Sequence, residues 1–425
     1  MATDNLLDRL LPSDFEVDHY EVLAVLERHL GPPGQDGPGK LIYPDCKEYA
    51  IRVRWGNGSI SRIEGGPGLG LIDLDSLKVA VREELSESPH FAQLESKGIP
   101  LHRIERAILF SSPQKVAGYF RTPDLQLLPA PGPAKQDADA TEHPFYIEFS
   151  VPMVQNSMIR DYRRWRIARQ TALVLNALLR THVRLKPRPA TSLWAVCRHT
   201  PNEPEAEQHS HWTQELYIDP DFRKSAVAFT EPHAPPIPQI PHDEYYGYYA
   251  KLIPVRLVTQ GLLLPDSLES MLAAFAKLDR ADRMRFVRAA QWIGAAYAGA
   301  WHNHMSSHFV ALVSAVESLA TELTDGPRCE KCGQIKGVTQ RFADFVEKYA
   351  GRDTGETKAK KALYSLRSQL THGSGLLAYD DYLSIMMIQT PYFFEHLDAF
   401  VEMAELVRRV AVGWLRDKGE RGDGA

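Results

Sequence analysis

The first half of the chain alternates between hydrophobic and polar positions, as strands with one buried face do. In residues 49–55 every second residue is apolar, a Gly-Asn-Gly sequence follows at 56–58, and the apolar residues resume with Ile60. This pattern predicts a β-hairpin. Residues 145–153 show the same alternation, and residues 161–185 directly after them have the period of a helix. We therefore expect a mixed fold in this half.

In the second half the apolar positions recur every three or four residues. Phe309, Val313, Val316 and Ala320, for example, fall on one face of a helix. Segments with this pattern run at 266–278, 281–323, 337–351, 357–373, 380–389 and 391–415. They predict a helical bundle.

The change of pattern near Pro265 suggests a domain boundary. We expect an α+β protein with a mixed α/β region at 1–265 and an all-α helical domain at 266–420. A loop rich in proline and acidic residues near 130–143 leaves open a division of the first region into two subdomains. We interpret that first region as one that senses a trigger or binds RNA.

The composition is that of a globular protein without a general nucleic-acid-binding surface. Of the 425 residues, 44% are hydrophobic and 24% are charged, and the net charge of -5 argues against a uniformly basic surface. Any contact with nucleic acid must therefore be local. No apolar run reaches the ~18 residues that cross a bilayer, and the acidic N-terminus is unlike a signal peptide. We expect a cytoplasmic protein that does not enter the membrane.

Arg367 interrupts an apolar stripe near the end of one predicted helix. Leu363 and Leu370 lie on the same helical face, so the guanidinium is expected to be partly buried. Burial of that charge is unfavourable unless an anion or a carboxylate pairs with it. His372 follows five residues later, and Gly373 is typical of a helix C-terminus, where the helix dipole favours the imidazolium form.

Two interpretations of Arg367 and His372 are open on physical grounds. In one, the two groups converge on a substrate, which requires the helix to end between them because an i, i+5 pair diverges by about 140° on a continuous helix. In the other, Arg367 pairs with an internal carboxylate such as that of Glu317, and His372 is a polar residue at a helix end.

The order of motifs in the second half resembles that of HEPN domains. Arg367 and His372 have the R-x4-H spacing of that superfamily, and the segments 309–323, 338–351 and 363–373 resemble the Apea-like group in particular. The resemblance covers residues 300–415, and the N-terminal half is not assigned to any family. Another HEPN subgroup has R-x4-H-x-Y with a tyrosine that is nucleotidylated. Ser374 stands at that position here, which argues against control of that kind.

The resemblance implies a helical bundle that dimerises with two R-x4-H motifs facing each other, and in many members a metal-independent endoribonuclease. Arg367 would then hold the scissile phosphate, and His372 would move protons between the attacking 2′-hydroxyl and the leaving 5′-oxygen. Ser368 would orient the phosphate or the histidine, and Glu317 would hold Arg367.

Two functions from different classes follow. The first is an RNA-cleaving effector of a bacterial anti-phage defence or toxin system, which acts as a homodimer through its C-terminal bundle and needs no cofactor for catalysis. The alternative is a catalytically inactive HEPN scaffold that dimerises and recruits a partner.

Cys329 and Cys332 have the C-x2-C spacing of a zinc knuckle. A structural zinc ion needs two further ligands. His304 and His308 stand at i, i+4 on a predicted helix, although roughly 30 Å of chain in helical form separates them from the cysteines. The same two cysteines of a second subunit are another source, and a metal-free loop is the third interpretation.

A cluster of arginines with interleaved aromatic residues marks the start of the helix predicted after residue 160. Its members are Arg160, Arg163, Arg164, Arg166 and Arg169. Such a cluster can follow an RNA backbone while Tyr162 and Trp165 stack on bases. It can equally be a solvated helix face that balances acidic loops.

Overall fold

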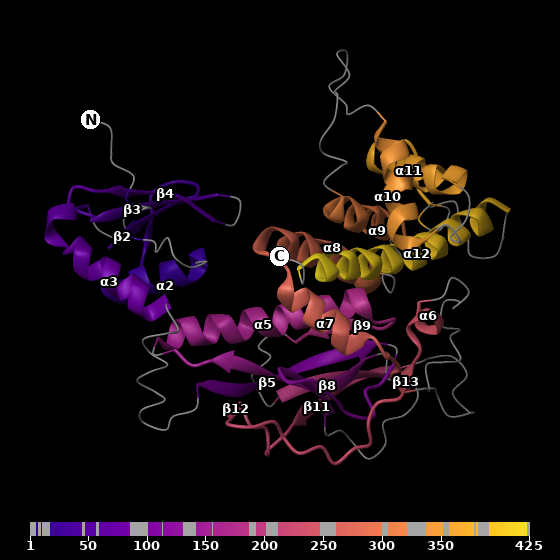
Figure 1. Ribbon diagram of the computed structural model, residues 1–425, viewed down its shortest axis with the longest axis horizontal. Helices are drawn as coiled ribbons and strands as arrows, with labels where there is room; N and C mark the ends of the chain where they lie inside the picture. The colour runs from indigo at the N-terminus through magenta and orange to yellow at the C-terminus, as the bar shows by residue number, and fades with distance from the viewer. Residues whose placement is uncertain are drawn as a thin grey trace. The chain divides into compact units, whose positions relative to one another are not determined.

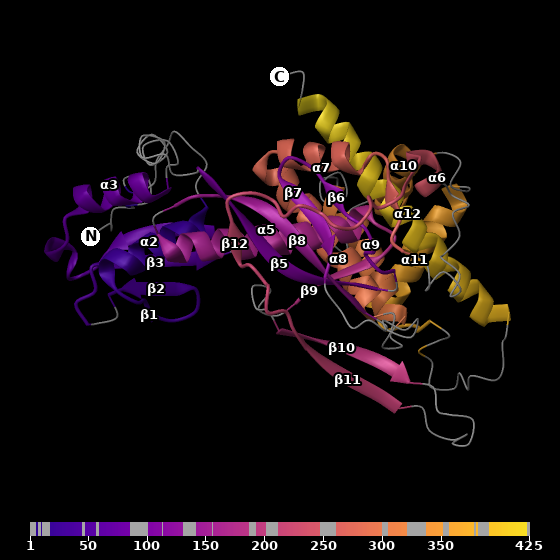
Figure 2. The ribbon, with the colours of Figure 1, turned by 90° about the horizontal axis from the view of Figure 1, so that it is seen from below.

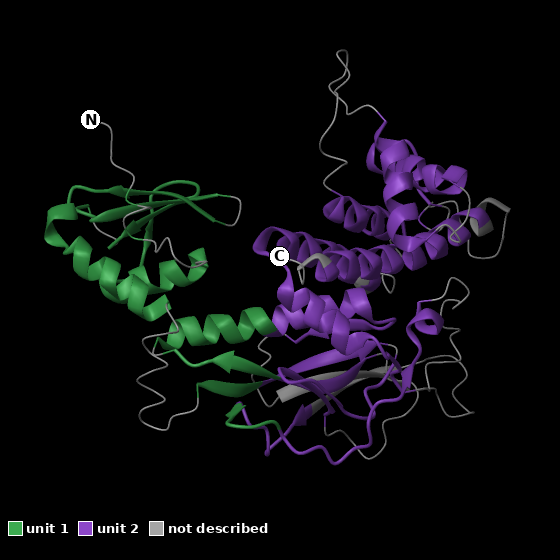
Figure 3. Cartoon of the chain, viewed as in Figure 1, with its two compact units in different colours: residues 1–105, 149–167, 225–229 green, residues 106–148, 168–224, 230–425 purple. Residues whose placement is uncertain are grey.

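The computed structural model of the chain describes residues 18–44, 47–56, 59–85, 101–112, 114–130, 142–154, 156–186, 193–200, 211–246, 261–299, 305–320, 337–351, 357–377 and 391–422, with the single residues 6, 10 and 380. The fold is α+β, as the sequence predicts, with antiparallel sheets and helices followed by a region of packed helices. The chain forms two units that interleave in sequence (Figure 3). The first unit contains residues 1–105, 149–167 and 225–229, and the second contains 106–148, 168–224 and 230–425.

The first unit contains a four-stranded antiparallel sheet with two helices on one face (Figure 1). Its elements are α2 (His19–Leu30), β1 (Gly34–Gln35), β2 (Lys40–Tyr43), β3 (Ile51–Gly56), β4 (Ser59–Gly65), a 3-10 turn η1 (Leu69–Leu71) and α3 (Leu74–Leu85). Val22 of α2, Val53 and Ile63 of the sheet and Val81 of α3 are completely buried in one core. The predicted hairpin is confirmed, because β3 and β4 pair antiparallel with Gly56 opposite Ser59.

A second sheet has six strands in the order β12-β5-β8-β7-β6, with β9 also paired to β5. These strands are β5 (His102–Ser112), β6 (Phe120–Arg121), β7 (Leu125–Pro129), β8 (His143–Pro152), β9 (His182–Leu185) and β12 (Ser225–Ala226). The alternation at 145–153 therefore does mark a strand, β8. The helix predicted after it is α5 (Ser157–Leu178), which begins four residues early because Asn156 caps it by accepting from the amide of Met158 (3.0 Å). The C-terminal end of the prediction is wrong, because α5 ends at Leu178 and residues 182–185 form strand β9.

Several shorter elements do not belong to either of these sheets. Strands β10 (Leu193–Thr200) and β11 (His211–Ile218) form an antiparallel pair that Figure 2 shows clearly. Strands β13 (Gln239–Ile240) and β14 (Leu264–Pro265) pair parallel to each other, and the short helix α6 (His242–Tyr245) follows β13.

The C-terminal region consists of packed helices, as predicted. They are α7 (Leu268–Lys277), α8 (Arg280–Gly299), α9 (Met305–Leu319), α10 (Val338–Ala350), α11 (Thr357–Thr371) and α12 (Pro391–Gly422). The longest predicted helical segment, 281–323, contains both α8 and α9, and residues 300–304 between them lie outside the described part, as does most of the predicted helix at 380–389. Helix α12 packs against α7, α9 and α10.

The two units do not divide the chain near residue 265, where the sequence pattern changes. The helices belong to the same unit as residues 106–148 and 168–224 because they pack on that part of the chain. Arg180, just after α5, donates from Nη2 to Glu405 of α12 at 2.7 Å. Gly294 lets α8 lie close to α5, since a Cβ at that position would be 3.2 Å from the side-chain amide of Asn176.

Candidate functional site

Helix α11 ends where Gly373 predicts that it should. Gly373 has a left-handed conformation (φ 69°), and its amide donates to the carbonyl of Leu370 (3.3 Å). The amide of Ser374 donates to the carbonyl of Gln369 (3.0 Å), which completes a Schellman C-cap. His372 occupies the cap position, and the residue is exposed. An exposed imidazole at a helix C-terminus is therefore present, as the sequence indicates.

Arg367 pairs with the carboxylate that the sequence suggested. Its Nη2 donates to Oε2 of Glu317 in α9 at 2.9 Å, and the two side chains are 23% and 24% exposed. The other carboxylate oxygen, Oε1, accepts from the hydroxyl of Tyr364 at 3.1 Å. Glu317 thus holds one edge of the guanidinium and joins α11 to α9.

Tyr364 lies one helical turn before Arg367 and supports the same pair. The guanidinium carbon of Arg367 is 5.9 Å from the centre of the Tyr364 ring, and the ring of Phe342 in α10 contacts the ring of Tyr364 at 4.9 Å. Burial, together with the nearby charge of Glu317, raises the pKa of Tyr364 to about 12. The phenol therefore stays protonated at neutral pH and remains a hydrogen-bond donor to Glu317.

Ser368 lies between the two motif residues on the last turn of α11. Its carbonyl oxygen accepts from the amide of His372 at 3.0 Å, so the helical bonding continues as far as the cap. The structure therefore brings Arg367 and Glu317 into contact, and it places Ser368 and His372 on the turn and the cap that follow. The roles of these four residues in catalysis stay predictions.

The predicted zinc site falls largely outside the described residues. Cys329, Cys332 and His304 are not among them. His308 lies in α9 and is only 7% exposed. The described residues contain no group of three or more His, Cys, Asp or Glu side chains arranged to hold a metal ion. The zinc knuckle at Cys329 and Cys332 therefore stays a prediction.

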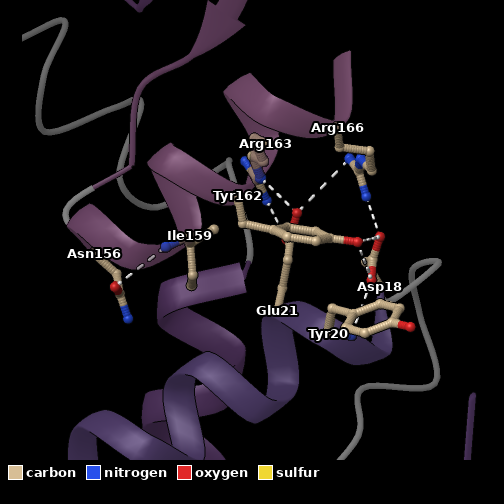
Figure 4. A network of polar contacts seen from close by, with 8 residues as sticks. All are labelled: Asp18, Tyr20, Glu21, Asn156, Ile159, Tyr162, Arg163 and Arg166. Atoms are coloured by element: carbon tan, nitrogen blue, oxygen red, sulfur yellow. Dashed lines mark hydrogen bonds and ion pairs between the residues drawn. The ribbon is translucent and has the colours of Figure 1, made fainter. Parts of the chain in front are cut away.

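The arginine cluster on α5 is largely engaged with carboxylates of the first unit (Figure 4). Arg163 is 7% exposed and makes a bidentate pair with Glu21 of α2, in which Nε donates to Oε1 at 2.9 Å and Nη2 to Oε2 at 2.7 Å. Arg166 donates to Asp18, the residue that caps α2, and the hydroxyl of Tyr162 donates to the same carboxylate at 3.3 Å.

Arg164 also has acidic neighbours. One guanidinium nitrogen is 3.7 Å from the carboxylate of Glu105, and the other is 3.5 Å from that of Asp161. Three of the five predicted RNA contacts therefore pair with carboxylates of the same unit, and Arg163 is buried instead of lying on a solvated helix face. Arg160 and Arg169 remain predicted RNA contacts.

Two features of these sites were not identified from the sequence. Tyr364 lies three residues before Arg367, and that spacing on one helical face was a usable signal. The partners of the α5 arginines had no such signal, because Glu21 is 142 residues before Arg163 in the chain. No local pattern links residues so far apart.

Comparison with known proteins leaves the family open. No protein-family model, curated protein or solved structure matches the chain. The resemblance to HEPN domains therefore supports only a proposal. Within the described residues, no helix is both long enough and apolar enough to span a membrane.

Proposed function

We propose that this protein is a metal-independent endoribonuclease of the HEPN type, in which Arg367 and His372 act on the RNA. The proposal rests on one observation: a guanidinium held at one edge by Glu317 lies on the last turns of a helix whose cap is an exposed histidine. The resemblance of residues 300–415 to HEPN domains also favours a role as an effector of a bacterial anti-phage defence or toxin system.

The proposed reaction needs a proton acceptor, a proton donor and a cation at the phosphate. The 2′-hydroxyl oxygen of the RNA attacks the phosphorus, and the bond from phosphorus to the 5′-oxygen breaks. A neutral imidazole takes the hydroxyl proton, and an imidazolium gives a proton to the leaving oxygen. In a homodimer two His372 side chains supply the two roles. The products are a 2′,3′-cyclic phosphate and a 5′-hydroxyl.

Arg367 suits the charge that develops on the phosphate. A guanidinium has five N–H donors, and the pair with Glu317 uses one of them, at Nη2. Its Nε is buried, so the donors that can meet phosphate oxygens are those on Nη1 and the second one on Nη2. Hydrogen bonds between charged groups are stronger than neutral ones. By holding one edge of the guanidinium, Glu317 reduces the conformational freedom that substrate binding would otherwise remove.

We expect His372→Ala and Arg367→Ala each to abolish RNA cleavage while the protein stays folded. Both residues are at least partly exposed, and loss of the Arg367 pair should cost only about 1 kcal/mol because water reaches Glu317. The assay incubates each protein with total RNA in excess chelator and maps fragment ends for 2′,3′-cyclic phosphate.

His233→Ala and Arg121→Ala, which alter an exposed histidine and a part-exposed arginine elsewhere, are the controls. Cleavage that survives both motif substitutions, or that stops with chelator alone, contradicts the proposal.

A catalytically inactive scaffold is the second candidate, and the pair of Arg367 with Glu317 also favours it. A guanidinium that already has a carboxylate partner contributes to the packing of α11 on α9 without any substrate. On this alternative, wild-type protein leaves RNA intact under every condition, and Arg367→Ala lowers stability without any change in RNA. The same assay therefore separates the two functions.

A further inference from the structure

Several arginines of the second unit lie around one buried carboxylate. Glu405 of α12 is 6% exposed, and its Oε2 accepts from Nη2 of Arg180 at 2.7 Å. Burial raises the pKa of this carboxyl group, whereas the guanidinium groups of Arg180, Arg408 and Arg409 lower it. Because Arg180 already compensates the charge of Glu405, the charge of Arg408 needs another partner.

Arg408 follows Glu405 on α12 by about one helical turn and yet makes no ion pair with it. The residue is 5% exposed, and its guanidinium carbon lies 4.3 Å from the centre of the Tyr297 ring in α8. Among the described residues, no carboxylate lies within ion-pair distance of this guanidinium, and its Nε is buried without a hydrogen-bond partner. Contact with an aromatic ring compensates a buried charge less than an anion does. Arg408 is therefore a buried cation whose charge is only partly compensated.

The hydroxyl of Tyr297 is a second buried donor beside this guanidinium. It makes no hydrogen bond of normal geometry with the described residues. Burial raises the pKa of Tyr297, and the charge of Arg408 lowers it in part, so the phenol stays protonated at neutral pH. Two neighbouring donors are thus buried without an acceptor, which is unfavourable. A water molecule accepts hydrogen bonds but does not compensate the charge, whereas an anion does both.

We propose that Arg408 and Tyr297 bind the phosphate group of a small molecule. A guanidinium matches the oxygens of a phosphate, and the remaining oxygens accept from neighbouring hydroxyl groups. The ligand is small because both donors are buried where α8 packs against α12, a position that a polymer such as RNA does not enter. The proposal does not depend on RNA cleavage, since none of its residues belongs to α9 or α11.

The test measures binding of inorganic phosphate and of AMP by isothermal titration calorimetry at constant pH and ionic strength. Arg408→Met removes the charge and keeps an apolar chain of similar length, and Tyr297→Phe removes only the hydroxyl. The matched controls are Arg416→Met, which alters an exposed arginine of α12, and Tyr349→Phe, which alters a tyrosine of α10. Circular dichroism establishes that each variant is folded.

The parent protein should bind one phosphate per protomer. Arg408→Met should lower the affinity about 100-fold and Tyr297→Phe about tenfold, whereas both controls should bind as the parent does. Tighter binding of AMP than of phosphate identifies an ester as the ligand, and the reverse identifies the free ion. No saturable binding of either probe up to about 10 mM overturns the proposal, and so does an equal loss in the controls. If Arg408→Met does not fold, Tyr297→Phe decides the question, because it keeps the ring that contacts Arg408.

Discussion

Tyr364 donates its hydroxyl hydrogen to the carboxylate that holds Arg367, and this contact can be removed without loss of the ring. Tyr364→Phe should lower the free energy of unfolding by about 1 kcal/mol, since Glu317 is partly exposed and water replaces part of the bond. If Arg367 acts on RNA, looser placement of its guanidinium should lower kcat about fivefold. KM should change little, because the phenol itself does not touch substrate.

The control for this prediction is a second tyrosine in the same helical region. Tyr349 of α10 donates to Asp417 of α12 at 3.1 Å, away from the motif helix α11. Tyr349→Phe removes the same atom and should leave kcat unchanged. If both variants lose the same activity, the effect belongs to the packing of the bundle and Tyr364 has no positioning role.

At the scale of elements, one buried ion pair joins the start of α5 to α2. Arg163 and Glu21 are both buried and form a bidentate pair, and Glu21 also lies 3.7 Å from Arg166, so neutralising Glu21 removes a buried carboxylate from beside two guanidinium groups. We expect Glu21→Gln to lower the free energy of unfolding by about 3 kcal/mol. Asp161→Asn, which removes an exposed carboxylate 3.5 Å from Arg164 on the same helix, should cost less than about 0.5 kcal/mol. Urea denaturation measures the free energy of unfolding of both variants. Equal losses in the two variants would contradict the distinction between the buried pair of Glu21 and the exposed carboxylate of Asp161.

The elements that could be predicted are those whose signals are local. Alternation and a Gly-Asn-Gly turn indicated the β3–β4 hairpin, and Gly373 indicated the end of α11. The separation of α8 from α9 was missed because the apolar period continues through both helices. The first unit's sheet register was also beyond reach, because it pairs Lys40 with Arg54 across strands that no local pattern aligns.

The candidate site also has residues with a local sequence signal and residues without one. The R-x4-H spacing identified Arg367 and His372, and Glu317 was named as a possible partner because a buried guanidinium needs an acid. The need of the Arg367 guanidinium for an acidic partner can be inferred without knowledge of the fold. The arginines of α5 were open to two interpretations because the sequence does not show which side chains face a carboxylate. The structure supplies that information through contacts between distant segments.

At the scale of the whole molecule, the oligomeric state determines whether the proposed site is complete. One protomer supplies one Arg367 and one His372, whereas the proposed reaction needs a proton acceptor and a proton donor together. We therefore predict a homodimer through the C-terminal helices. Light scattering should give twice the protomer mass of 47.9 kDa at micromolar concentration.

A mixing experiment then asks whether both protomers contribute to one site. Arg367→Ala and His372→Ala proteins are each expected to be inactive, but heterodimers formed after mild dissociation and reassociation retain one guanidinium and one imidazole at a shared site. Partial recovery of cleavage in the mixture is the expected result, because the single remaining histidine must then serve more slowly in both roles. A strict monomer that still cleaves RNA rules out the shared site. A dimer whose mixed variants stay inactive although exchange of subunits has been verified contradicts the service of one histidine in both roles.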